Sequence, residues 1–134
     1  MATVYHSATL NVSADVAWDF IDRYSRSEVH MFSVCAGERQ DGDTRVVILS
    51  DGSEVRERNV TVDADRMRAV YTVPGLPGIE HHQAEMRVVM ASDGTATLVW
   101  CTDVLPDSYA ELLRGVYPSM FEEMVAAVNG HKLR

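Results

Sequence analysis

Three residues of this sequence carry side chains that could move protons in otherwise apolar surroundings: Glu57, Tyr71 and His82. A carboxylic acid, a phenol and an imidazole are groups that serve as general acids and bases. Groups of these three kinds could orient a bound molecule and exchange protons with it. Such chemistry needs at least two of them to converge within hydrogen-bond reach.

Glu57 is the most informative of the three, because strand alternation places it inside. In the predicted strand 54–62 its neighbours are charged and point outward, whereas Glu57 shares the opposite face with Val55. An isolated buried charge is very costly, so this carboxyl group must be paired, hydrogen-bonded or neutral. It is either a ligand anchor or general acid with a raised pKa, or a structural acid bonded to Tyr, His or backbone amides.

The strongest hairpin signal is Asp51-Gly52, which is typical of a two-residue turn. That turn predicts a shared inner face with two residues from each strand: Val46, Ile48, Val55 and Glu57. Arg45 would then face solvent, and Val47 and Leu49 would also lie outside.

His82 follows the segment Pro74–Gly78, which the prolines and glycines mark as an irregular loop and a candidate lid over a pocket entrance. Within reach of Tyr71 or Glu57, His82 could shuttle protons. It is otherwise a rim or surface histidine, since the adjoining His81 cannot share its face.

The remaining candidates for a pocket lining are apolar or aromatic. Tyr71 and Trp100 offer flat apolar area with a polar tip, which suits a planar ligand but also an ordinary core. The same two interpretations apply to one strand residue and four helix residues: Met86, Tyr117, Met120, Phe121 and Met124.

These side chains are positioned by a predicted α+β order of elements. A strand (3–12) leads into a short helix capped by Ser13, and a second short helix or turn is expected at 25–32. Six further strands are then predicted, over residues 33–39, 45–49, 54–62, 68–73, 80–90 and 95–104. After Pro106 the apolar period becomes helical up to Gly130, with a kink or break expected at Pro118. One antiparallel sheet of about seven strands covered by this helix accounts for the whole chain as a single domain, 1–134.

Composition excludes several classes of function. The formal net charge of −8 argues against nucleic acid and against docking on an anionic membrane. We find no run of 18 apolar residues and no secretion signal, so membrane insertion is not expected and a cytoplasmic location is the default. Cys35 and Cys101 have no metal-ligand spacing, and neither a nucleotide-binding nor a zinc motif occurs, so we expect no cofactor and no metal.

The order of elements and several local motifs resemble the START/Bet v 1-like (SRPBCC) superfamily, in particular the bacterial polyketide cyclase/dehydrase and lipid-transport-like proteins. The motifs are Asn11–Trp18 at the first strand-to-helix junction, Asp51–Arg58 across the hairpin, Tyr71–Val73, and Thr97–Trp100. The resemblance implies a helix-grip fold with a ligand cavity between the sheet and the long helix. It also makes His30 a candidate polar pocket residue.

The sequence is compatible with three functions. The first is the binding or carriage of an apolar small molecule such as a lipid, a quinone or a polyketide. The second is a polyketide cyclase/aromatase or dehydratase that uses Glu57, His82 and Tyr71. The third is an interaction module with a collapsed cavity, acting through an exposed face or as a homodimer. Because the polar set is thin, the sequence favours the first.

Overall fold

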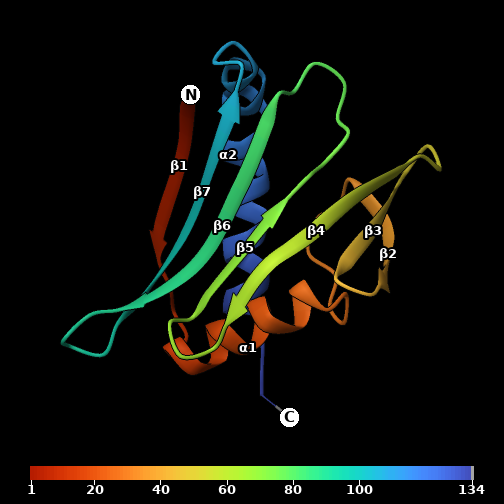
Figure 1. Cartoon of the computed structure of the whole chain (residues 1–134). Coiled ribbons are helices and arrows are strands. Elements are labelled where there is room, and N and C mark those ends of the chain that lie inside the picture. The colour runs from red at the N-terminus through yellow and green to blue at the C-terminus, as the bar shows by residue number, and fades with distance from the viewer. Residues whose placement is uncertain (134) are drawn as a thin grey trace.

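In the computed structural model, which describes residues 1–133, the chain forms a curved antiparallel sheet and two helices (Figure 1). The elements in chain order are β1 (Ala2–Thr9), α1 (Ala14–Ser25), β2 (Cys35–Asp41), β3 (Thr44–Leu49), β4 (Glu54–Asp63), β5 (Arg68–Thr72), β6 (His81–Met90), β7 (Ala96–Leu105) and α2 (Tyr109–Asn129). The seven strands follow the order β1-β7-β6-β5-β4-β3-β2. This is the helix-grip α+β fold predicted from the sequence.

The long helix α2 lies behind the sheet in Figure 1, and α1 crosses the lower end of the sheet. β1 occupies one edge beside β7 and β2 occupies the other, so the segment containing α1 carries the chain from edge to edge. One face of the sheet and both helices enclose the main core, which includes Ile21, Leu98, Trp100, Met124 and Val128.

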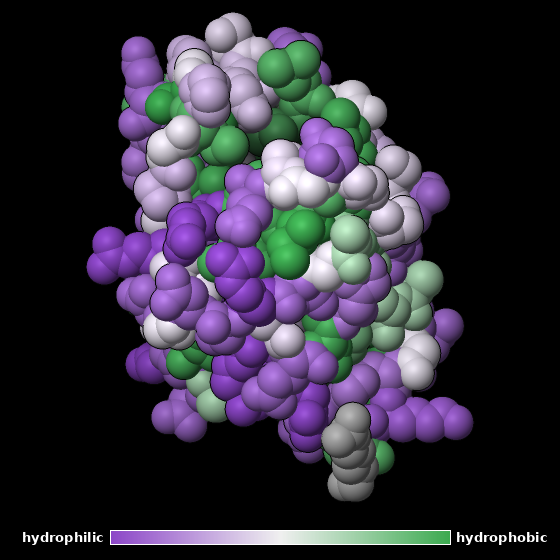
Figure 2. Space-filling model, turned by 90° about the vertical axis from the view of Figure 1, so that its right-hand side faces the viewer, coloured by the Kyte–Doolittle hydropathy of each residue, from purple (hydrophilic) through white to green (hydrophobic). Residues whose placement is uncertain are grey.

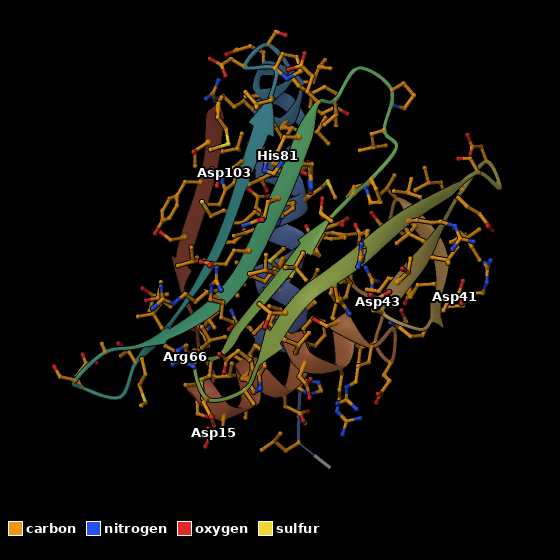
Figure 3. All side chains as sticks on the ribbon, viewed as in Figure 1. Asp15, Asp41, Asp43, Arg66, His81 and Asp103 are labelled. Atoms are coloured by element: carbon orange, nitrogen blue, oxygen red, sulfur yellow. The ribbon has the colours of Figure 1, made fainter. Side chains whose placement is uncertain are left out.

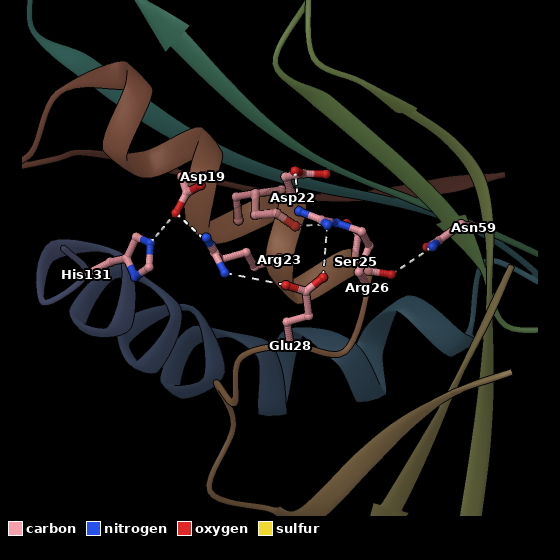
Figure 4. Close-up of polar contacts among 9 residues, drawn as sticks. Asp19, Asp22, Arg23, Ser25, Arg26, Glu28, Asn59 and His131 are labelled. Atoms are coloured by element: carbon pink, nitrogen blue, oxygen red, sulfur yellow. Dashed lines mark hydrogen bonds and ion pairs between the residues drawn. The ribbon is translucent and has the colours of Figure 1, made fainter. Parts of the chain in front are cut away.

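Polar contacts fix the position of α1. Ser13 caps the helix, since its Oγ accepts a hydrogen bond from the backbone N–H of Val16 at 3.3 Å, as the sequence predicts. Farther along, His131 Nε2 lies 2.7 Å from Asp19 Oδ2, just beyond the end of α2 (Figure 4). At the other end of α1, Asn59 Nδ2 of β4 donates to the carbonyl of Ser25 at 2.8 Å.

The structure decides two alternatives that the sequence left open. Residues 26–34 form turns and irregular chain, so the turn expected at 25–32 is observed and the second short helix is not, since the hydrogen bonds at this point close turns on Arg23 and Tyr24. The helix α2 continues through Pro118 without a break. A proline removes one backbone hydrogen bond of the helix, and the packing of Phe121 and Met124, which follow Pro118 along α2, into the core compensates for this loss.

The β3–β4 hairpin differs from the predicted register by one residue. Leu49 N–H donates to the Ser53 carbonyl at 2.8 Å, which closes a three-residue loop with Gly52 at φ +86°. A loop of three residues with glycine in the left-handed conformation is a common alternative to the two-residue turn. Val47 is therefore opposite Val55, and Arg45 is opposite Glu57.

The slip moves Val46 and Ile48 to the outer face, so their predicted inward orientation is wrong. Val46 is nevertheless buried there, because ion pairs between β2 and β4 span β3 above it. These pairs are Arg39–Glu54 and Arg56–Asp41. Figure 3 labels Asp41 and Asp43 at the turn between β2 and β3.

We predict that Met124→Ala lowers the free energy of unfolding by about 2–5 kcal/mol, because the deletion leaves a cavity in the core. Met124 is 0% exposed, whereas Met90, at 65%, offers a matched control. Met90→Ala is expected to change the free energy of unfolding by less than about 0.5 kcal/mol. Urea denaturation measures both, and equal effects would contradict the placement of α2 against the sheet.

Candidate functional site

A cavity of about 130 Å³ lies between the sheet, α2 and the segment that precedes β2. Its lining residues are Tyr24, Phe32, Val34, Cys35, Val47, Leu49, Val55, Glu57, Tyr71, Trp100, Tyr117 and Met120. Apolar and aromatic side chains dominate this list. On the side of the molecule that carries β2, β3 and the β5–β6 connection, hydrophobic side chains also reach the surface between hydrophilic ones (Figure 2).

The size of the cavity limits what it holds as it stands. An apolar cavity of roughly 150 Å³ accommodates benzene, whereas pockets for drug-sized ligands measure roughly 300–1,000 Å³. A volume of about 130 Å³ therefore suits a molecule of one ring. Longer ligands require the cavity wall to move.

Arg45 and Glu57 form a buried ion pair at the cavity. Arg45 Nη1 lies 2.5 Å from Glu57 Oε1, and its guanidinium carbon lies 3.8 Å from the centre of the Tyr24 ring. The side chain of Arg45 is 3% exposed, and within residues 1–133 its Nε has no hydrogen-bond partner. Burial raises the pKa of Glu57, and the attraction of Arg45 offsets only part of that effect.

This pair corrects the prediction that Arg45 faces solvent. The inward orientation predicted for Glu57 is confirmed, because alternation along β4 alone determines it. Its partner depends on the hairpin register and was missed. The apolar residues Val47 and Leu49, which the predicted register left outside, were the signal that the register was wrong.

Three aromatic residues form a connected wall of the cavity. Trp100 and Tyr117 stack with ring centres 4.1 Å apart, and Trp100 Nε1 donates a hydrogen bond to the Tyr71 hydroxyl at 3.2 Å. Burial raises the pKa of Tyr71 and of Tyr117. Both phenols therefore stay protonated at neutral pH and can donate a hydrogen bond.

His82 is buried but does not line this cavity. Its Nδ1 accepts a hydrogen bond from the backbone N–H of Val73 at 3.2 Å, and burial lowers its pKa. It lines a second hollow, of about 150 Å³, beside Pro74, Gly75 and Ile79. The ring centres of His82 and Tyr71 are 6.0 Å apart, and no hydrogen bond joins the two side chains in the described chain.

Pro74 and Gly75 of the loop 74–78 line the hollow beside His82, whereas the lining of the apolar cavity includes no residue of this loop. Leu76 of this loop packs against the main core. The loop is therefore not part of the wall of the apolar cavity, and its role as a lid stays a prediction.

Apart from Val46, Ile48 and His82, the predicted site residues fall into three groups. Six of them line the cavity: Val55, Glu57, Tyr71, Trp100, Tyr117 and Met120. Three are buried core residues outside the lining: Met86, Phe121 and Met124. His30 is exposed, with its Nδ1 3.1 Å from Glu38 Oε2 of β2, so it does not line the cavity as the resemblance implied.

Half of the lining residues were not predicted from the sequence, and most of these come from two segments. Phe32 ends the segment 25–32 that was expected as a short helix or turn, and Val34 and Cys35 follow it in the predicted strand 33–39. Tyr24 follows Phe20 by four residues on the buried face of α1, a spacing that would have indicated it.

Two further features bear on function. Within residues 1–133 no group of three or more His, Cys, Asp or Glu side chains is arranged to hold a metal ion. In the same range, no helix has the length and apolar character needed to cross a membrane.

A family model described as polyketide cyclase / dehydrase and lipid transport matches residues 1–131. The chain belongs to this family. Membership supports a role in binding a hydrophobic ligand or in cyclisation. No curated protein matches the chain.

Solved structures share the fold of this polyketide cyclase/dehydrase family member. The protein XoxI from Bacillus cereus is 17% identical, with 97% of both chains covered and a TM-score of 0.80. An aromatase/cyclase from a Streptomyces species is 20% identical, with 96% of this chain and 92% of that chain covered and a TM-score of 0.71. Norcoclaurine synthase from Thalictrum flavum is 14% identical, with 97% and 87% covered and a TM-score of 0.71.

We predict that Arg45→Met lowers the free energy of unfolding by about 3–5 kcal/mol, because Glu57 is left buried without a counter-charge. The double variant Arg45→Met/Glu57→Leu should recover most of the loss, since an apolar pair of similar volume replaces the ions. Arg58→Met is the control, because its ion pair with Asp43 is exposed and contributes little. Urea denaturation that ranks Arg45→Met with Arg58→Met would refute the buried pair.

His82 should make stability depend on pH. Its pKa is lowered in the folded chain, so from its ordinary value of 6.5 down to the folded value the unfolded chain binds the proton more readily. The free energy of unfolding therefore falls as pH falls through this window. His82→Asn keeps an acceptor for the Val73 N–H and removes the titration, so its loss of stability between pH 7.5 and 5 should be smaller. Parallel curves for the two proteins would contradict this assignment.

Proposed function

We propose that this chain binds a small apolar molecule in the cavity of about 130 Å³, as a carrier or receptor that performs no chemistry on it. The observation that carries the proposal is the composition of the lining, in which Glu57 is the one residue among Asp, Glu, Lys, Arg and His. A largely apolar cavity with a few placed polar groups is what binding of a small molecule requires.

A lipid, a quinone or a polyketide fits this proposal only if the wall opens. Phe32 and Val34 form part of the wall, and Ser33 between them is held to α2 by Glu123. The Ser33 N–H lies 3.1 Å from Glu123 Oε2, and the Ser33 hydroxyl bonds the other carboxylate oxygen. Release of these bonds would widen the cavity towards the exposed side chain of Val34.

The alternative is a cyclase/aromatase or dehydratase. In its favour, Glu57 and Tyr71 face one cavity and burial raises the pKa of each. Against it, Glu57 is paired with Arg45, and His82 lies in another hollow with its Nδ1 bonded to Val73. The trio of Glu57, Tyr71 and His82 therefore lacks the convergence that proton transfer needs, which favours binding over catalysis.

The proposal is tested by titrating the protein with toluene and following the aromatic signals by NMR. The wild type should show saturable shifts of the Trp100 signals, because one ring fits the cavity. Val55→Phe places extra volume on an inward position of β4 and should abolish binding.

Val60→Phe is the matched control, since Val60 lies on the same strand and is 56% exposed. It should bind toluene like the wild type. If Val55→Phe folds and binds toluene as tightly as Val60→Phe does, the cavity is not the binding site.

A further inference from the structure

The polar groups left without partners in the cavity indicate what a ligand must carry. This step rests on the proposed function, namely that the cavity binds a small molecule. Among residues 1–133, Glu57 has one hydrogen-bond partner, Arg45, which occupies Oε1. The Glu57 side chain is 18% exposed, and it lines the cavity. Oε2 is therefore left to accept a hydrogen bond from a molecule in the cavity.

Tyr71 offers the complementary group. Its hydroxyl oxygen accepts the indole N–H of Trp100, and within the described chain its own O–H has no acceptor. Glu57 and Tyr71 lie on the inner face of neighbouring strands, since Asn59 pairs with Tyr71 and Glu57 is two residues before Asn59. Residues at such diagonal positions on one face of a sheet can contact the same group.

A hydroxyl group matches both side chains at once, because it donates one hydrogen bond and accepts another. The charges at the cavity also limit the charge that the ligand can carry. A ligand carboxylate would meet Glu57 at short range in a low-dielectric space, where like charges repel strongly. A cation would add a charge to a cavity in which Arg45 already offsets the charge of Glu57.

We propose that the ligand is a neutral molecule of about one ring that bears a hydroxyl group of phenol or enol type, which donates to Glu57 and accepts from Tyr71. The ring lies against the wall that Trp100 and Tyr117 form. Glu57 and Tyr71 thereby discriminate hydroxylated rings from plain hydrocarbons of the same size.

The test compares phenol with toluene, which has the same number of non-hydrogen atoms and no hydroxyl group. In a cavity without polar partners, phenol binds at least about tenfold more weakly than toluene, because its hydroxyl group loses its hydrogen bonds to water and finds no partner in the cavity. Here phenol should bind the wild type at least as tightly as toluene does, as measured by NMR titration. This comparison needs no variant.

Tyr71→Phe removes one of the two partners and keeps the ring. It should weaken phenol binding about tenfold more than it weakens toluene binding, and saturable binding of toluene shows that the variant is folded. Tyr5→Phe, at an exposed tyrosine of β1, should change neither affinity.

The outcomes separate this inference from the proposed function. Toluene that binds at least tenfold more tightly than phenol, or a Tyr71→Phe variant that binds phenol normally, overturns the hydroxyl assignment and leaves the binding function intact. If neither compound binds the wild type, both the inference and the proposed function fail.

Discussion

The buried pair of Arg45 and Glu57 is the interaction on which the rest of the site depends. Removing two charges from water costs several kcal/mol for each ion, which only close mutual contact and further hydrogen bonds offset. Here the guanidinium group bonds Glu57 on one side and lies over the Tyr24 ring on another. The pair is therefore stable only while β3, β4 and α1 keep their present positions.

The pair also selects the register of the β3–β4 hairpin. A slip of one residue would turn Arg45 outward and leave Glu57 inside without a counter-charge, at a cost of several kcal/mol. The three-residue loop with Gly52 supports the observed register from the other end of the hairpin. On the α1 side, the bond from Asn59 to Ser25 holds the helix end that carries Tyr24.

Much of the fold follows from short-range patterns, and the site does so only in part. Alternation along β4 placed Glu57 inside correctly, because side-chain parity within one strand needs no partner. The partner of Glu57 depends on loop geometry, and Asp51-Gly52 is compatible with both the predicted and the observed loop. The position of Phe32 depends on how an irregular segment packs on the core, which no periodic pattern encodes.

The central claim is that Glu57 and Tyr71 recognise a hydroxyl group inside the cavity, next to the ion pair with Arg45. A crystal structure of the protein soaked with phenol tests it most directly. The account predicts a ring between Val55 and Tyr117, with its oxygen within hydrogen-bond distance of Glu57 Oε2 and of the Tyr71 hydroxyl. Phenol in the hollow beside His82, or in the cavity with its oxygen turned away from Glu57, would contradict it.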